Sequence, residues 1–142
     1  MAVYAAPSRL GSEGGRDATL HCGSCMVTPM PRFLISFDDG DMVIPEAELP
    51  RVDADSHQVV REAKQAGVWI FGGGIAQQPA GIVAPDATVT EGAYPEAKAV
   101  IGGFCILEVP TRDEALRWAA KFAAACRCAQ QVRLIMHDPE SL

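Results

Sequence analysis

The sequence predicts an α+β fold, a ferredoxin-like βαββαβ sandwich in which two helices cover one face of an antiparallel sheet. One observation is the order of the apolar segments, whose periodicity indicates strand, helix, strand, strand, helix, strand along the chain. The other is the size and composition. The chain has 142 residues, of which 49% are hydrophobic and 21% charged, as expected for one globular domain with its own core.

Composition divides the chain near Met30. Residues 1–29 are rich in Gly and Ser and sustain no period of 2 or 3.6 residues, so we expect an N-terminal arm that is flexible or results from a wrongly assigned start codon. Residues 30–142 are expected to form the α+β domain.

The first predicted elements are a strand over residues 31–37 and a helix over residues 53–66. The strand is aromatic and β-branched and stops at a turn signal, Asp38-Asp39-Gly40. The helix is expected to end before Gly67. Its apolar face comprises Val59, Val60, Ala63 and Ala66, and its N-cap is expected to be Asp53, Asp55 or Ser56.

A glycine triplet, Gly72 to Gly74, follows a short apolar strand predicted over residues 68–71. It does not fit the dinucleotide-binding pattern, because Gln77 occupies the third glycine position and no helix opens there. A backbone bulge is the favoured interpretation. A weaker strand over residues 88–90 is expected to pair with residues 68–71.

The second half of the fold begins with the strongest strand signal, residues 101–109, which Pro110 closes. Thr111 and Glu114 then match a capping box at the start of a helix that should run to about Ala125. Residues 131–136 predict the last strand.

Two of these strands predict an assembly. Residues 68–71 and 104–109 are apolar at nearly every position rather than at alternate ones, so the sheet face without helices must also be covered. We therefore expect a homodimer in which two sheets pack about a two-fold axis, a dimeric α+β barrel that encloses a cavity for a small polar ligand.

The charge of the chain argues against two classes of partner. Twelve basic and eighteen acidic residues give a net charge of −6, which disfavours nucleic acid and anionic membrane surfaces. The longest uncharged stretch, residues 66–85, contains Pro79 and several glycines and cannot be a membrane helix. Because residues 1–15 lack a secretory signal, a cytoplasmic location is expected.

The five cysteines are expected to be thiols, since their number is odd and no export signal is present. Cys22 and Cys25 have the spacing of half a zinc site, which Cys126 and Cys128 could complete. That second half would be unusual, so we expect no metal, and we expect no cofactor.

Four separated segments resemble the signature of the YCII-related (DGPF-domain) family over about residues 30–138. They are Gly92-Ala93-Tyr94-Pro95-Glu96-Ala97-Lys98, Ile101-Gly102-Gly103-Phe104, Asp113-Glu114-Ala115-Leu116-Arg117-Trp118-Ala119 and Val132-Arg133. The chain departs from the family where Glu91-Gly92-Ala93-Tyr94 replaces Asp-Gly-Pro-Phe, and where Ala99 replaces an acid. The resemblance implies a dimeric α+β barrel of largely unassigned activity. The YCII-related family includes a branch proposed to contain small-molecule hydrolases or lyases, and members encoded beside or fused to sigma factors.

Candidate ligand-binding residues lie around this signature. Glu96 and Lys98 point to the same side of an extended segment and could hold a polar ligand, although a surface ion pair explains them equally well. The hydroxyl of Tyr94 could enter the same pocket, or its ring could simply pack. Gly102 and Gly103 could mark a close approach of a ligand, a bulge or a tight packing contact.

His57 is the candidate catalytic base, with Glu96 as a candidate carboxylate. In the predicted helix it falls in the first turn, about 120° from the core stripe, where the helix N-terminus favours a neutral imidazole. The resemblance implies a partner Asp just before the terminal Gly, but Gln65 stands there. Asp53 or Asp55 could substitute or could only cap the helix, and an ordinary solvent-facing His is the alternative.

Two functions follow. The first is a cofactor-free enzyme that acts on a small polar molecule in the cavity. The alternative is a non-catalytic small-ligand-binding or accessory module linked to sigma-factor regulation. No dedicated catalytic motif in the sequence decides between them.

Overall fold

The computed structural model of the protein describes residues 29–92 and 100–141. The predicted arm, residues 1–29, therefore lies outside the described residues except for its last one. The elements in chain order are β1 (Arg32–Asp38), η1 (Glu46–Glu48), α1 (Leu49–Gln65), β2 (Trp69–Gly74), β3 (Gly81–Val83), β4 (Val89–Glu91), β5 (Ile101–Glu108), α2 (Arg112–Cys126), β6 (Gln131–Leu134) and η2 (Pro139–Ser141).

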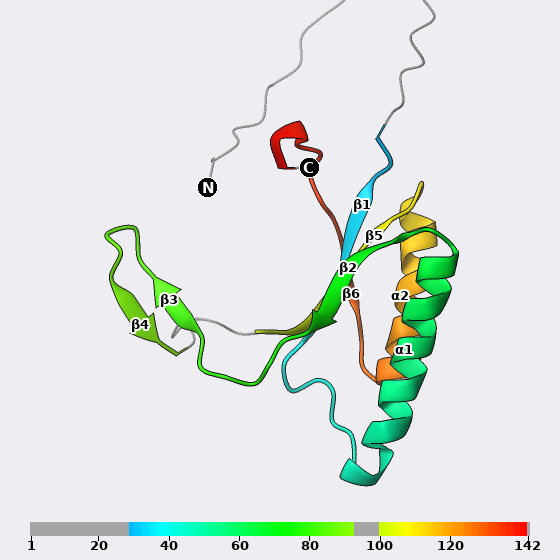
Figure 1. Ribbon diagram of the computed structural model, residues 1–142, viewed down its shortest axis with the longest axis horizontal. Helices are drawn as coiled ribbons and strands as arrows, with labels where there is room; N and C mark the ends of the chain where they lie inside the picture. Colours follow the sequence, from blue (N-terminus) through cyan, green and yellow to red (C-terminus); the bar gives the residue numbers. More distant parts are fainter. Residues whose placement is uncertain (1–28, 93–99, 142) are drawn as a thin grey trace, which may run out of the picture.

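Four strands form one antiparallel sheet in the order β2-β5-β1-β6. Helices α1 and α2 lie side by side on one face of this sheet (Figure 1). The order β1-α1-β2-β5-α2-β6 confirms the predicted α+β fold with βαββαβ connectivity. Strands β3 and β4 form a separate hairpin inserted between β2 and β5.

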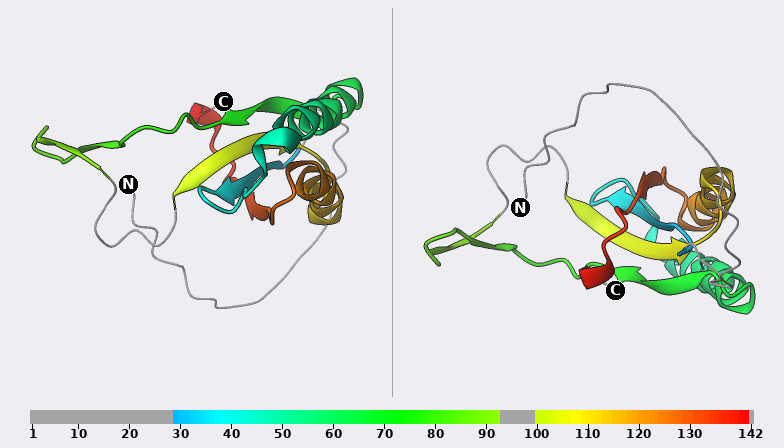
Figure 2. Two further views of the ribbon diagram at one scale, coloured as in Figure 1. Left: turned by 90° about the horizontal axis from the view of Figure 1, so that it is seen from below. Right: turned by 90° about the horizontal axis from the view of Figure 1, so that it is seen from above.

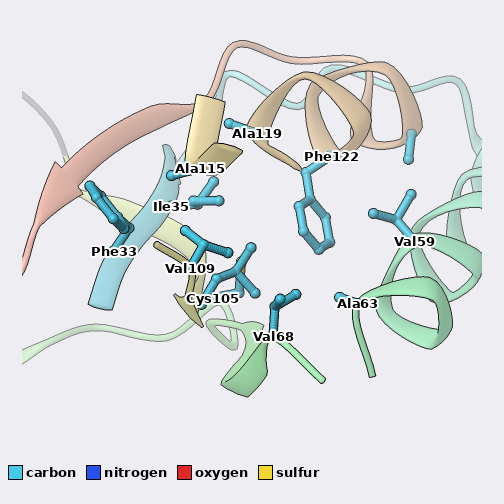
Figure 3. Close-up of a cluster of buried hydrophobic side chains, with 12 residues drawn as sticks. Phe33, Ile35, Val59, Ala63, Val68, Cys105, Val109, Ala115, Ala119 and Phe122 are labelled. Carbon is cyan, nitrogen blue, oxygen red and sulfur yellow. The ribbon is translucent and has the colours of Figure 1, made fainter. Parts of the chain in front are cut away.

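The core lies between the helices and the sheet, where alternation along β5 decides which side chains enter it. Gly103, Cys105 and Leu107 are buried, and the residues between them are half-buried. Figure 3 shows Phe122 of α2 directed between the sheet residues and Val59 of α1. Burying one such large apolar side chain contributes roughly 1.5–3 kcal/mol to the free energy of unfolding.

Helix α1 begins earlier than predicted, which changes the position of His57. The N-cap is Glu48, without a side-chain hydrogen bond, and Pro50 lies in the first turn, where its missing N–H costs nothing. The prediction of a cap at Asp53, Asp55 or Ser56 is therefore wrong. His57 lies in the middle of the helix, so the argument from the helix N-terminus does not apply. The predicted end is confirmed, because Gly67 has a φ of 72° directly after the helix.

The expected pairing of residues 68–71 with residues 88–90 is wrong. Strand β2 pairs with β5, and β4 pairs with β3, a strand too short to be predicted. The turn between β3 and β4 is held locally, since the backbone N–H of Thr88 donates to Oδ1 of Asp86 at 3.0 Å. Closing so short a loop costs less chain entropy than reaching β2.

The predicted bulge lies before the glycine triplet rather than within it. The register between β2 and β5 shifts between Trp69 and Phe71 and then continues through Gly74. A Cβ at Gly72 would lie 2.6 Å from Cβ of Cys105 and 2.8 Å from its Cα. Glycine is thus required at position 72 by the close approach of the two strands.

The face of the sheet opposite the helices is open (Figures 1 and 2). By register it carries Leu34 of β1, Phe71 of β2, and Phe104 and Ile106 of β5. The rings of Phe71 and Phe104 pack with centroids 5.9 Å apart. In the described part of the chain, no helix is long and apolar enough to cross a membrane.

Candidate functional site

A pocket of about 670 Å³ lies between α1, the sheet and the C-terminal end of α2. Its walls are largely apolar, which suits the body of a small organic molecule. The residues that line it from the sheet and from α2 include Ile35, Phe37, Trp69 and Phe122. The pocket is on the helical side of the sheet. The cavity predicted between two sheets requires a second chain and stays a prediction.

One stripe of α1 supplies charged groups to this pocket. Asp53, His57, Val60 and Lys64 all line it, and their spacing of four, three and four residues places them on one face of a helix. This stripe is adjacent to the buried core positions of the same helix. The helix therefore presents an acid, an imidazole and an amine in a row along one wall.

His57 and Asp53 form a pair within this stripe. Nδ1 of His57 lies 3.4 Å from Oδ2 of Asp53, and their side chains are 61% and 71% exposed. An imidazole whose Nδ1–H faces a carboxylate leaves Nε2 free to accept a proton. Of the two acids considered as substitutes for the Asp absent at Gln65, the structure brings Asp53 to His57.

Asp55 faces a different partner, Arg127. This arginine follows α2 with a φ of 54°, and its guanidinium lies 3.4 Å from Oε2 of Glu48 and 4.0 Å from Oδ2 of Asp55. The contacts link the first half of α1 to the end of α2. Both segments contribute to the pocket, so Arg127 helps to keep two of its walls together.

Cys126 also lines the pocket. Burial, with a smaller effect of the neighbouring Cys128, raises the pKa of the Cys126 thiol to about 11. Because the thiolate is the nucleophilic form, a thiol with this pKa is a poor nucleophile at neutral pH. Cys126 therefore serves as an apolar wall.

Gly102 and Gly103 lie beneath the ring of Phe37. A Cβ at Gly103 would lie 2.5 Å from Cε1 of Phe37, and one at Gly102 would lie 2.9 Å from Cε2. Tight packing therefore accounts for both glycines, and their role in ligand binding stays a prediction. Gly73 and Gly74 also line the pocket, and an added Cβ at either position would meet no atom within 4 Å.

Three predicted ligand-binding residues, Tyr94, Glu96 and Lys98, lie outside the described residues, as do Cys22 and Cys25. Their roles stay predictions. Over residues 29–92 and 100–141, no group of three or more His, Cys, Asp or Glu side chains is placed to hold a metal ion.

Sequence reasoning missed Lys64 and the aromatic wall residues. A signal for Lys64 was present, since it follows His57 by seven residues and two helical turns return it to the same face. Phe37 and Trp69 carried no such signal, because their position in the wall depends on how β1 and β2 lie relative to α1.

A family model described as the YCII-related domain matches residues 25–136. No curated protein matches the sequence.

Proposed function

The chain belongs to the YCII-related family, and on that premise we propose that it is a cofactor-free enzyme whose substrate binds between α1 and the sheet. His57 acts as the general base, and Asp53 orients its ring. The observation that carries the proposal is the contact of 3.4 Å between these two side chains in the wall of the pocket.

The proposed chemistry is proton transfer. Nε2 of His57 takes a proton from the substrate or from a water molecule, and the carboxylate of Asp53 stabilises the imidazolium that forms. General-base catalysis of this kind contributes about 10²- to 10⁴-fold to a rate. The residues of the wall restrict which molecules can present this proton to His57.

The lining favours a substrate with an apolar body and an anionic group. The aromatic and aliphatic walls suit the body, and Lys64 can bind a carboxylate. Lys64 is seven residues beyond His57, a rise of about 10 Å along the helix axis. A small carboxylic acid of this length would contact the base and the amine together.

The experiment that tests the proposed activity follows turnover by proton NMR in D₂O. Small 2-oxo acids, lactones and hydroxy acids are incubated with the protein, and loss of substrate or deuterium incorporation is recorded. For any reaction found, His57→Gln should lower kcat by about 10²-fold, as loss of a general base does. Asp53→Asn should lower it less, and Asp113→Asn, the matched control at the exposed start of α2, should leave it unchanged. Unchanged turnover in His57→Gln would exclude His57 as the base.

Binding is tested separately with phenylacetate as the probe. It should shift the ring resonances of His57, and Lys64→Met should weaken its binding by about tenfold or more, the value of a charge-assisted hydrogen bond. Arg117→Met is the matched control, because Arg117 is an exposed residue of α2 that does not line the pocket. Equal loss in both variants would argue against an anion site at Lys64.

A non-catalytic ligand-binding or accessory module, linked to sigma-factor regulation, is the second candidate. The exposure of the Asp53–His57 pair favours it, because a solvated imidazole is less well oriented than an enclosed one. Binding of phenylacetate with no turnover of any compound tested would support this alternative.

We propose that the protein forms a homodimer, the dimeric α+β barrel that the sequence predicts. The open sheet face supports this assembly, because Phe71 is 62% exposed there beside other apolar side chains. The proposed location is the cytoplasm, which the unpaired thiols of Cys105, Cys126 and Cys128 support.

A further inference from the structure

The β3–β4 hairpin stands away from the rest of the domain (Figure 2). Within the described chain, the hydrogen bonds of residues 80–92 all join residues of that segment. None of these residues is buried, and Val83 and Val89 are 64% and 61% exposed. A two-stranded hairpin alone is at best marginally stable in water, so another surface is needed to stabilise it.

The two faces of the hairpin differ in chemistry. Val83 lies directly opposite Val89, and Gly81 lies opposite Glu91. Because side chains alternate along a strand, the two valines and Glu91 share one face. This face presents an apolar pair with a carboxylate two residues away.

The open face of the four-stranded sheet has the complementary chemistry. Leu34 and Ile106 lie on it as opposite partners of β1 and β5, and Arg133 of β6 lies opposite Leu34. Arg133 is exposed, and in the part of the chain that the structure describes it forms no ion pair. An apolar surface with a guanidinium beside it matches an apolar pair with a carboxylate beside it.

We propose that the β3–β4 hairpin is an exchange arm, which packs its Val83, Val89 and Glu91 face on the open sheet face of a second copy, with Glu91 beside Arg133 of that copy. This inference rests on the proposed homodimer and adds the contact that holds it together. The hairpin extends away from its own sheet on the side opposite the helices (Figure 1), which favours an intermolecular contact.

A second copy is the occupant because one chain carries both surfaces. A two-fold axis that places the hairpin of one copy on the sheet of the other also makes the reciprocal contact, so both hairpins and both open faces are covered at once. A stable dimer buries roughly 800 Å² on each partner. In the proposed assembly both hairpins and both open sheet faces contribute to this surface.

The test is a charge-exchange experiment on the full-length protein by sedimentation equilibrium. Glu91→Arg and Arg133→Glu each place like charges together in their own homodimers, so each should raise the dimer Kd by about tenfold or more. A mixture of the two variants should dimerise as the unmodified protein does, because both contacts of the mixed dimer join opposite charges. Arg61→Glu, on the exposed side of α1, is the control of equal charge change and should not alter the Kd.

Each outcome bears on a separate claim. Weakened homodimers that are rescued by mixing support the exchange arm. Rescue in a Glu91→Arg/Arg133→Glu double variant without rescue by mixing would place the hairpin on its own sheet and overturn the proposal. A dimer that neither variant weakens would also overturn it, and a monomer at micromolar concentration would remove the dimer as well. The turnover and phenylacetate measurements do not depend on these results.

Discussion

The carboxylate of Asp53 contacts the His57 ring, because the two side chains are one helical turn apart on α1. The contact is made by Nδ1, and in the proposed mechanism Nε2 takes the proton. Lys64, two turns beyond His57, adds a fixed positive charge to the same wall. In the proposed function, these three side chains on one stripe act as a base, its orienting acid and a site for an anion.

Gly72 and Gly73 are neighbours with opposite tolerance to a side chain. Gly72→Ala should destabilise the fold by about 1–3 kcal/mol, since its Cβ would meet the backbone of β5. Gly73→Ala should leave the free energy of unfolding within about 0.5 kcal/mol of the original, because no atom lies within 4 Å of its added Cβ. Urea unfolding measures the free energy of unfolding of both variants. An equal loss of stability in the two would show that β2 does not approach β5 as closely as the structure has it.

Cys105 should make the protein sensitive to alkaline pH. Burial, with a smaller effect of Cys126, raises the pKa of its thiol from 9.0 to about 12. The folded state therefore holds this proton more tightly than the unfolded chain, so the stability contribution is complete below pH 9 and is lost as the pH rises from 9 towards 12. Between these two pH values, the free energy of unfolding falls with a slope that approaches about 1.4 kcal/mol per pH unit.

The measurement is the free energy of unfolding in urea at several values between pH 8 and pH 10.5. Cys105→Ala lowers stability at every pH by creating a cavity, but its curve should fall less steeply above pH 9. Parallel curves for the two proteins would show that Cys105 does not titrate on unfolding in this range.

At the scale of elements, α1 serves two surfaces. Val52, Val59 and Ala63 are buried against the core, while the adjacent stripe with His57 faces the pocket. The C-terminal end of α2 lies across one end of the pocket from α1. Lys121 of α2 connects the two helices by donating a hydrogen bond to Glu62 of α1. The pocket therefore depends on the relative position of two helices, and movement of either would change its shape.

Loss of a hydroxyl should lower the stability of the protein more at Thr111, the N-cap of α2, than at Ser56, inside α1. Thr111→Ala should destabilise the protein by about 1 kcal/mol, because Oγ1 of Thr111 accepts a hydrogen bond from the backbone N–H of Glu114 at 3.2 Å. Ser56→Ala should have a much smaller effect, since Ser56 lies inside α1 and donates to the carbonyl oxygen of Asp53. Thermal unfolding measures both variants. A larger loss in Ser56→Ala would contradict the start of α1 at Leu49.

At the scale of the whole molecule, the sheet has one covered and one open face. The helices bury one side, and the other retains Phe71 and further apolar groups against solvent in a single chain. The hairpin and the open face are both incompletely packed within one chain. In the proposed dimer, the hairpin of each copy covers the open face of the other.

Deletion of residues 1–28 should leave the domain folded, with a Tm within a few degrees of that of the full chain. The physical reason is that the buried hydrophobic core of the described residues extends from Phe33 to Ala125, so the deletion removes none of it. Differential scanning calorimetry compares the two proteins. A loss of more than about 10 °C, equivalent to several kcal/mol for a domain of this size, would show that these residues stabilise the fold.

The elements that could be predicted from the sequence are those with a local signature. The apolar run over residues 101–109, the Thr111–Glu114 capping box and the glycine after α1 are each local features of the sequence, and the structure contains the strand, the cap and the helix end that they predict. The start of α1 could not be placed, because Pro50 is compatible with a first helical turn as well as with a loop. Similarly, no local feature revealed that β2 pairs with β5.

The sequence by itself determined the fold class, the polar and apolar faces of α1 and the presence of His57 on that helix, because helical and strand periodicities are properties of neighbouring residues. Only the tertiary structure decided that the pocket lies on the helical side of the sheet and that Phe37 covers Gly102 and Gly103. It also decided that Arg127 approaches Asp55, because the end of α2 lies beside α1. These features depend on residues far apart in the chain, whose distances are set by packing and not by their order.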